Sequence, residues 1–247
     1  MDGVRRRAVG RLCDGAVTAG LGGGAPPDRL CDLGAGIGTV GLLTLWRLGR
    51  RAPGPRRLLM VEAQERSQAL ARRTVAGLDL GGAEVELRLG DLRDDRCFHE
   101  GERFPLVTGS PPYFPVERGT SSPMAQRAAA RMELRGTIAD YARRAARLLT
   151  PEGWFVAVFP AADPRGPAAF ADAGLHLRLT QPIVFRHGDP PLIAVFAGGL
   201  GPGSHERRDP LPVRGADGRW TEAWLAVREE MGAPERWLAE GRRGRAG

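Results

Sequence analysis

The chain has 247 residues, a formal charge of +7 and no lysine, so all 36 of its Lys/Arg residues are arginines. This length suits one substantial domain with a full core, and the basic excess favours a polyanionic partner, nucleic acid before membrane. No apolar run approaches the roughly 18 residues that span a bilayer. Three widely spaced cysteines without a Cys-x-x-Cys pair argue against a zinc site and favour reduced thiols in the cytoplasm.

The amino-terminal half alternates between helical and strand patterns. Apolar residues near a helical repeat predict a leading helix over 4–19, and the Gly/Pro-rich stretch at 22–27 ends it. Short apolar runs then predict strands at 29–34, 57–62, 83–89 and 104–108, with helices at 39–48 and 64–76.

The carboxyl-terminal half continues this pattern with a long helix at 125–149, a strand at 154–159 and a helix at 167–173. Two further strands, at 175–185 and 192–197, are joined by a turn too short for a parallel crossover, so we expect an antiparallel hairpin at one edge of the sheet. The Gly/Pro/Arg-rich segment 198–215 is predicted to be irregular, and 221–231 to be a last helix.

Strands that alternate with helices of ten or more residues imply parallel βαβ units. We therefore predict an α/β fold with a doubly wound, mostly parallel, seven-stranded Rossmann-like sheet and an antiparallel edge hairpin. The expected organisation is a helix and linker over 1–27, the main domain over 28–200, and a carboxyl-terminal appendage over 201–247 that packs on the same domain.

A glycine-rich turn, Asp32-Leu-Gly-Ala-Gly-Ile-Gly38, follows the first predicted strand, and Gly36 to Gly41 also satisfies the dinucleotide pattern G-x-G-x-x-G. A lone match to that pattern is weak evidence. A pyrophosphate prefers a helix N-terminus without fixed anions, whereas Asp32 stands directly before the glycines, where it can pair with an ammonium group. A ligand with an amino acid, a sulfonium and an adenosine but no phosphate fits better, and S-adenosylmethionine is such a ligand.

Two further carboxylates end the next two strands. Glu62 ends the second strand, where a carboxylate can accept both ribose hydroxyls, and Asp91 follows the third, where it can accept from the amine of adenine. Each alone is more often an ordinary polar strand end. Together with Asp32 they place three acids at the carboxyl ends of three successive strands, facing one crevice.

The fourth predicted strand ends abruptly in Ser110-Pro111-Pro112-Tyr113. The prolines fix φ and cannot donate to a strand ladder, so the loop is stiff. Such a loop can hold a planar ring that bears an amine, because the Ser110 hydroxyl and a proline carbonyl accept hydrogen bonds and Tyr113 stacks. A proline-rich surface turn is the alternative for the loop alone, but beside three acids the loop favours a methyltransferase.

The motifs Asp-Leu-Gly-Ala-Gly-Ile-Gly, Val-Glu-Ala, Gly-Asp-Leu and Ser-Pro-Pro-Tyr, in that order, resemble those of class I methyltransferases acting on exocyclic amines. More narrowly, Ser-Pro-Pro-Tyr-Phe-Pro, Ala-Arg-Met-Glu-Leu-Arg-Gly-Thr-Ile and Arg-Leu-Leu-Thr-Pro-Glu-Gly resemble the bacterial tRNA adenine-N6 methyltransferases that modify the adenine next to the anticodon of a valine tRNA. The resemblance runs from about Gly10 to Pro234. The family ordinarily has Asn where this chain has Ser110, and Ser-Pro-Pro-Tyr also occurs in cytosine-N4 DNA methyltransferases.

The resemblance implies S-adenosylmethionine as cofactor and RNA, expected to be tRNA, as partner. Its motifs imply that the cofactor is bound by Asp32, Gly34, Ala35, Gly36, Gly38, Glu62, Ala63, Asp91, Leu92 and Ser110. The expected catalytic residues are Ser110, Pro111, Pro112 and Tyr113, and the expected substrate-binding residues are Tyr113, Phe114, Arg127 and Arg131. We also expect a monomer, without a metal site or membrane contact.

Four alternatives stay open. Arg127 and Arg131 lie four residues apart on the predicted long helix, where a solvated face is the alternative to phosphate contact. An enzyme that methylates the side-chain amide of a glutamine in protein makes the same demand on a Pro-Pro-Tyr loop. A cytosine-N4 or adenine-N6 DNA methyltransferase and a catalytically inactive module that keeps the fold are the other two.

Overall fold

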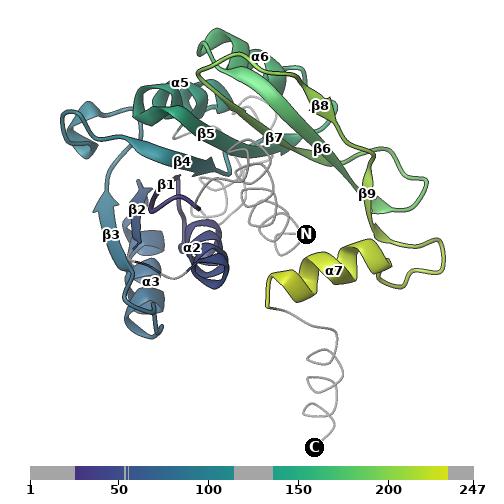
Figure 1. Cartoon of the computed structure of the whole chain (residues 1–247), viewed down its shortest axis with the longest axis horizontal. Coiled ribbons are helices and arrows are strands. Elements are labelled where there is room, and N and C mark those ends of the chain that lie inside the picture. The colour runs from purple at the N-terminus through teal and green to yellow at the C-terminus, as the bar shows by residue number, and fades with distance from the viewer. Residues whose placement is uncertain (1–25, 53, 55, 114–135, 233–247) are drawn as a thin grey trace, which may run out of the picture.

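In the computed structural model, residues 26–52, 54, 56–113 and 136–232 are described, and they form one mixed sheet flanked by helices (Figure 1). The strands are β1 (Arg29–Leu33), β2 (Arg57–Glu62), β3 (Glu84–Leu89), β4 (Phe104–Gly109), β5 (Leu149–Pro160), β6 (His176–Arg186), β7 (Ile193–Gly199), β8 (Glu206–Arg207) and β9 (Leu211–Arg214). The helices are α2 (Thr39–Arg51), α3 (Glu65–Ala76), α5 (Ile138–Leu148), α6 (Arg165–Asp172) and α7 (Glu222–Glu230), with a 3-10 turn, η1 (Asp95–Cys97). The predicted leading helix over 4–19 lies outside the described residues.

The sheet order is β3-β2-β1-β4-β5-β7-β6-β8, with β9 also paired to β6. Strands β1 to β5 pair in parallel, whereas β7 runs antiparallel to both β5 and β6. These pairings confirm the predicted α/β class and the antiparallel hairpin. The chain moves outward from β1 to β3 and then returns to place β4 beside β1, so a topological switch point lies between β1 and β4. Ligands of open α/β sheets bind at the carboxyl ends of the strands at such a point.

The core lies along the middle of the sheet. In β5, residues 155–159 are Phe-Val-Ala-Val-Phe and all have 0% exposure, as expected for a strand covered on both faces. The apolar face of α5 covers part of it, with Ala142, Ala145 and Leu148 buried. The continuous apolar run at 155–159 therefore identifies β5 as a central, fully buried strand of the sheet.

Helix α5 is shorter than predicted. Thr137 is its N-cap, and a reciprocal capping box joins Thr137 to Asp140, so the helix begins at Ile138. Gly136, with φ of 124°, precedes the cap in a conformation that suits glycine. The prediction of one unbroken helix over 125–149 is therefore wrong at this junction, and residues 125–135 lie outside the described part. The helix also ends earlier, because β5 begins at Leu149.

The segment predicted to be irregular, 198–215, contains two short strands. β8 and β9 pair in parallel with β6, with Leu179 opposite Glu206 and Ile183 opposite Leu211. The seven predicted strands are all present, and these two extend the sheet past the hairpin. Their sequences are too short to carry a clear alternating apolar pattern. They form strands because their backbone groups hydrogen-bond with the groups on the outer edge of β6.

The last described helix, α7, is hydrogen-bonded to α2 in the amino-terminal half of the chain. Trp224 of α7 is 0% exposed, and Arg47 of α2 donates 2.8 Å and 2.9 Å hydrogen bonds to the carbonyl and carboxylate of Glu230. The helix predicted over 221–231 is confirmed, and the division of the chain at residues 27 and 200 stays a prediction.

Among the described helices, none combines the length and apolar character that a membrane-spanning segment needs. The two described cysteines, Cys31 and Cys97, are free thiols. In the same part of the chain, no group of His, Cys, Asp and Glu side chains is arranged to hold a metal ion.

Candidate active site

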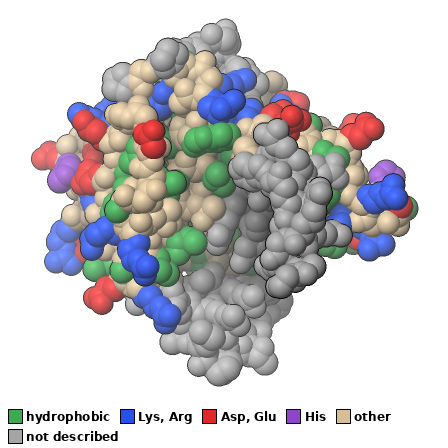
Figure 2. Space-filling model, turned by 90° about the horizontal axis from the view of Figure 1, so that it is seen from below, with side chains coloured by type: hydrophobic (Ala, Val, Ile, Leu, Met, Phe, Trp, Pro, Cys, Tyr) green, Lys and Arg blue, Asp and Glu red, His purple; other side chains and the backbone are tan. Residues whose placement is uncertain are grey.

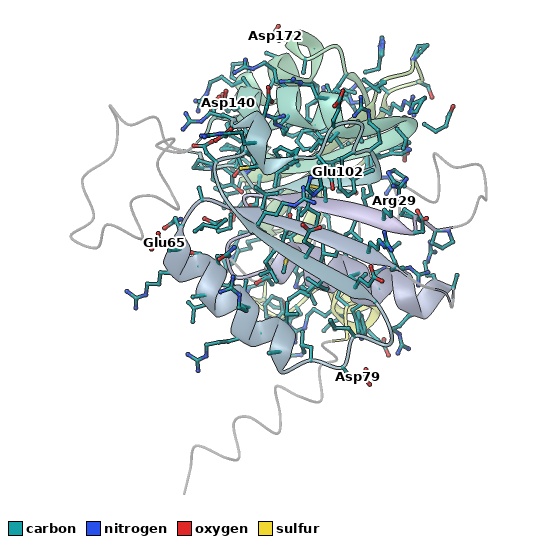
Figure 3. The ribbon with its side chains drawn as sticks, turned by 90° about the vertical axis from the view of Figure 1, so that its left-hand side faces the viewer. Arg29, Glu65, Asp79, Glu102, Asp140 and Asp172 are labelled. Carbon is teal, nitrogen blue, oxygen red and sulfur yellow. The ribbon has the colours of Figure 1, made fainter. Side chains whose placement is uncertain are left out.

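The glycine turn and the Ser110 loop lie next to each other at the switch point. Leu33, the last residue of β1, is in register with Gly109, the last residue of β4, so Gly34 and Ser110 continue from neighbouring strand ends. Glu65 and Asp140, near the starts of α3 and α5, lie on the side of the molecule opposite Arg29, which begins β1 (Figure 3). The carboxyl ends of the strands and the amino ends of the helices therefore meet at one edge.

The glycine turn has a backbone that only glycine adopts readily. Gly34, Gly36 and Gly38 have φ values of 60°, 59° and 86°, in the left-handed region. The Ala35 amide donates a 3.0 Å hydrogen bond to the Val61 carbonyl, which ties the turn to β2. A Cβ built on Gly36 would meet no atom within 4 Å, so the turn presents open space on that side.

Asp32, in β1, binds the start of the helix that follows the glycine turn. Its side chain is 2% exposed, and its carboxylate accepts a 2.9 Å hydrogen bond from the Gly41 amide and a 2.7 Å hydrogen bond from the Thr108 hydroxyl. Gly41 lies in the first turn of α2, which has no side-chain cap of its own. Asp32 thus occupies a helix amide that a pyrophosphate would use, which argues against the dinucleotide interpretation of Gly36 to Gly41. Its expected pairing with an ammonium group stays a prediction.

Replacing Asp32 with asparagine is expected to flatten the pH dependence of stability. Burial, with a smaller contribution from Glu62, raises the pKa of Asp32 from 3.8 to about 7, against the opposing hydrogen bonds from Thr108 and Gly41. Between about pH 4 and about pH 7 the unfolded chain has released this proton while the folded chain keeps it. The contribution to stability is therefore complete below about pH 4 and is lost as the pH rises through about 7.

Urea unfolding at about pH 5 and about pH 8 measures this effect. The wild-type free energy of unfolding should fall by about 2 kcal/mol more between these values than that of Asp32→Asn, since one pKa unit corresponds to about 1.4 kcal/mol. Asp172→Asn, at an exposed side chain, should keep the wild-type slope. Parallel curves for wild type and Asp32→Asn would show that Asp32 does not titrate in this window.

Glu62, the last residue of β2, hydrogen-bonds with the backbone of the glycine turn. Its side chain is 7% exposed, and its two carboxylate oxygens each accept a 2.7 Å hydrogen bond, one from the Gly36 amide and one from the Gln64 amide. Each oxygen retains a second lone pair, so the carboxylate can still accept from two hydroxyls. Ala63 lies between Glu62 and Gln64, in the bend that leads from β2 into α3.

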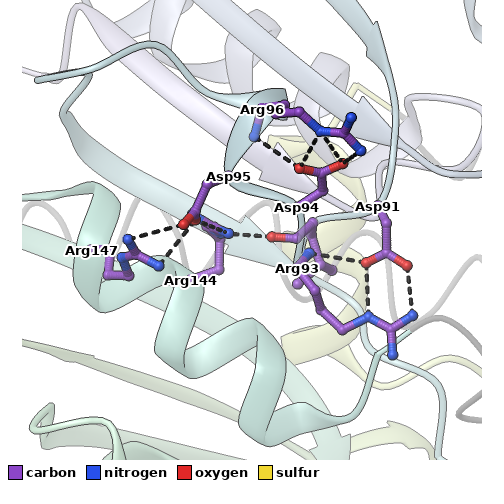
Figure 4. Close-up of polar contacts among 8 residues, drawn as sticks. Asp91, Arg93, Asp94, Asp95, Arg96, Arg144 and Arg147 are labelled. Carbon is purple, nitrogen blue, oxygen red and sulfur yellow. Dashed lines mark hydrogen bonds and ion pairs between the residues drawn. The ribbon is translucent and has the colours of Figure 1, made fainter.

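Asp91 follows β3 and is bound by its neighbour Arg93 (Figure 4). The Arg93 guanidinium donates hydrogen bonds of 2.9 Å and 2.6 Å to the two Asp91 oxygens, and the Arg93 amide donates a third of 2.9 Å. The Arg93 side chain is about half exposed, at 48%. An adenine amine that bonds to Asp91 therefore has to share this carboxylate with Arg93.

Arg144 of α5 holds the loop that carries Asp91 and Leu92. Its side chain is 7% exposed, and it donates a 2.6 Å hydrogen bond to the Leu92 carbonyl and a 2.7 Å hydrogen bond to the Asp95 carboxylate (Figure 4). Its guanidinium also lies 4.5 Å from the centre of the Phe98 ring. This arginine positions the loop that is expected to contact the adenine, and in a chain where every basic residue is an arginine no sequence signal distinguishes it.

The Ser110 loop leaves β4 and is anchored at Tyr113. Ser110 is exposed and Pro111 is buried. The Tyr113 ring packs edge-on against Phe159, with centroids 5.6 Å apart and planes at 89°. Arg165, at the start of α6, donates a 3.2 Å hydrogen bond to the Tyr113 carbonyl. Residues of β5 and α6 thus hold the aromatic residue of the loop in place.

The structure brings Asp32, Glu62, Asp91 and the Ser110 loop to one edge of the sheet. Phe114, Arg127 and Arg131 lie outside the described residues, so their expected contacts stay predictions. Sequence analysis missed three residues that hold this edge together: Thr108, Arg144 and Arg165. Thr108 was recognised only as the end of a strand, and the others lie on helices where nothing in the local pattern marks them.

The hydrogen-bonding groups at this edge of the sheet fit S-adenosylmethionine. Acidic groups at three strand ends suit an ammonium, two ribose hydroxyls and an adenine amine, which are all hydrogen-bond donors. The turn offers open space at Gly36 and has its first-turn helix amide engaged by Asp32, as a ligand without phosphate requires.

No protein-family model matches the chain. Several curated relatives carry the name tRNA1(Val) (adenine(37)-N6)-methyltransferase, and two of them illustrate the similarity. The relative from Cronobacter sakazakii is 28% identical over 214 residues, which cover 85% of this chain and 83% of the relative. The relative from Tolumonas auensis is 24% identical over 204 residues, which cover 82% of this chain and 81% of the relative.

Solved structures share the fold. A predicted O-methyltransferase from Agrobacterium tumefaciens superposes with a TM-score of 0.59 at 19% identity, covering 82% of this chain and 89% of that one. A structure from Listeria monocytogenes, assigned to the class I S-adenosylmethionine-dependent methyltransferases, has a TM-score of 0.55 at 12% identity, covering 90% and 69%. The chain has the class I methyltransferase fold, as its motifs indicate, and this fold implies S-adenosylmethionine as the cofactor.

Proposed function

We propose that this protein is an S-adenosylmethionine-dependent methyltransferase that modifies the N6 amine of an adenine in tRNA. The observation that carries the proposal is the pairing of β1 with β4, which places the glycine turn and the Ser110 loop side by side. A methyl group held over the first would face an amine held by the second. The name shared by the curated relatives supports adenine N6 and tRNA as the finer assignment.

The amine of adenine is a poor nucleophile because its lone pair is delocalised into the ring. In this proposal Ser110 Oγ and the Pro111 carbonyl accept its two hydrogens, which favours an sp³ nitrogen and directs the lone pair. The cofactor supplies a sulfonium methyl group with a neutral thioether as leaving group. The surplus proton on the methylated nitrogen passes to water, so no strong base is required of the chain.

Tyr113 is the proposed stacking surface for the base. A base stacked on an aromatic side chain is worth about 1–3 kcal/mol, and the base must be single-stranded or flipped out to reach it. The edge-on contact with Phe159 and the hydrogen bond from Arg165 restrict the position of Tyr113, so little ordering is needed when the base binds.

The net charge of +7 supports an RNA partner. On the face drawn in Figure 2, arginine side chains are interspersed with acids, so the described residues there form no single basic field. The expected phosphate contacts of Arg127 and Arg131 belong to this proposal, as do a monomeric state and a cytoplasmic location.

Incubation of the purified protein with methyl-labelled cofactor and either total tRNA, duplex DNA or a cell protein extract tests the proposal. We expect label in tRNA, and N6-methyladenosine after nuclease digestion and nucleoside mass spectrometry. Label in protein alone would support the glutamine-amide alternative, and N4-methylcytosine would overturn the adenine assignment. Binding of cofactor without transfer to any of the three would favour the inactive module.

A further inference from the structure

Tyr141, in the first turn of α5, fills the space between the glycine turn and the Ser110 loop. The residue is 5% exposed. A Cβ built on Gly109 would lie 2.7 Å from Tyr141 Cδ1, and one built on Gly34 would overlap the Tyr141 hydroxyl. The ring therefore packs on glycines at the ends of both β4 and β1, and larger residues at either position would displace it.

The hydroxyl of Tyr141 lies beside the acids of the site. Burial raises the pKa of this hydroxyl well above 10.0, followed by the charges of Glu62, Asp32, Asp91 and Asp140. The group is thus a permanent neutral O–H that can donate. It forms no hydrogen bond with any residue in the described part of the chain.

The neighbouring acids do not use this donor. Asp32 accepts from Gly41 and Thr108, Glu62 accepts from two backbone amides, and Asp91 accepts from Arg93. The Tyr141 oxygen is also not among the fully enclosed polar atoms of the described residues, so a ligand atom that accepts a hydrogen bond can reach it. The amino-acid end of S-adenosylmethionine carries one such group, its carboxylate, next to the glycine turn expected to bind it.

We infer that Tyr141 is a positioning residue whose hydroxyl donates a hydrogen bond to the carboxylate at the amino-acid end of the cofactor. This inference rests on the proposed function. The hydroxyl at Gly34 would fix that end of the cofactor, while the ring separates it from Gly109 and the loop that holds the acceptor. The methyl group is thereby held in line with the acceptor amine.

Calorimetry with two cofactor analogues tests the inference. S-adenosylhomocysteine keeps the amino-acid end, whereas 5′-methylthioadenosine has the same nucleoside and a sulfur atom without it. Tyr141→Phe removes only the hydroxyl, so we expect the Kd for S-adenosylhomocysteine to rise about tenfold and that for 5′-methylthioadenosine to stay unchanged. Thr180→Val, which removes a hydroxyl from a buried side chain of β6 outside the site, should alter neither Kd.

The outcomes separate the two proposals. Equal loss of affinity for both analogues would show that Tyr141 acts on the nucleoside or on the fold, and unchanged affinity for both would show that its hydroxyl binds nothing. Either result refutes the inference while leaving the proposed methyltransferase intact. If the wild-type protein does not bind S-adenosylhomocysteine at all, the proposed function fails and this inference fails with it.

Discussion

Replacement of Ser110 with alanine is expected to lower kcat for tRNA methylation by about 100-fold, because one acceptor for the hydrogens of the target amine is lost. The serine is exposed at the end of β4, and its neighbour Gly109 is buried in the sheet, so the change should leave the fold intact. Cofactor affinity, measured by calorimetry, should fall far less than kcat, because the other residues expected to bind the cofactor are unchanged.

Two variants serve as controls for this result. Ser204→Ala makes the same change at an exposed serine outside the site and should keep full turnover. Ser110→Asn restores an acceptor oxygen and the residue usual in the related family, so it should retain most of the activity and the same N6-methyladenosine product. Wild-type kcat in Ser110→Ala would show that the serine does not contact the amine.

Replacement of Glu62 with glutamine is expected to raise the Kd for S-adenosylhomocysteine by about 100-fold. In the wild-type protein both carboxylate oxygens accept hydrogen bonds, from the Gly36 and Gln64 amides. Glutamine exchanges one acceptor for an NH₂ group, which then faces a backbone donor and cannot accept from ribose. Hydrogen bonds to charged groups contribute about 1.5–3 kcal/mol, and about 2.7 kcal/mol corresponds to 100-fold in Kd.

Glu65→Gln is the matched control for Glu62→Gln. Its side chain is exposed at the start of α3, three residues along the chain, and its replacement should leave the Kd unchanged. Thermal unfolding of both variants separates a local loss of cofactor contacts from a loss of the folded state. A wild-type Kd in Glu62→Gln would remove Glu62 from the proposed cofactor site.

Much of the cofactor edge could be predicted from local sequence. Each acid stands at or near the carboxyl end of a strand, and the glycine turn and the two prolines end their strands by backbone geometry alone. Each of these signals lies within a few residues of the strand that it ends, so it can be recognised without knowledge of the fold. The start of α5 was less predictable. Gly136 and the N-cap Thr137 stop the helix there, although the surrounding residues favour a continuous helix.

The sequence by itself determined which residues end the strands and which chemical groups they offer. The tertiary structure alone decided what those groups contact. Asp32 and Thr108 are 76 residues apart and bond only because the sheet order places β4 beside β1. Arg144 reaches Leu92, and Tyr141 reaches Gly34, because α5 packs against elements that lie far away from it in the sequence. Such contacts depend on how distant elements pack, and packing is set by the whole core rather than by any local pattern.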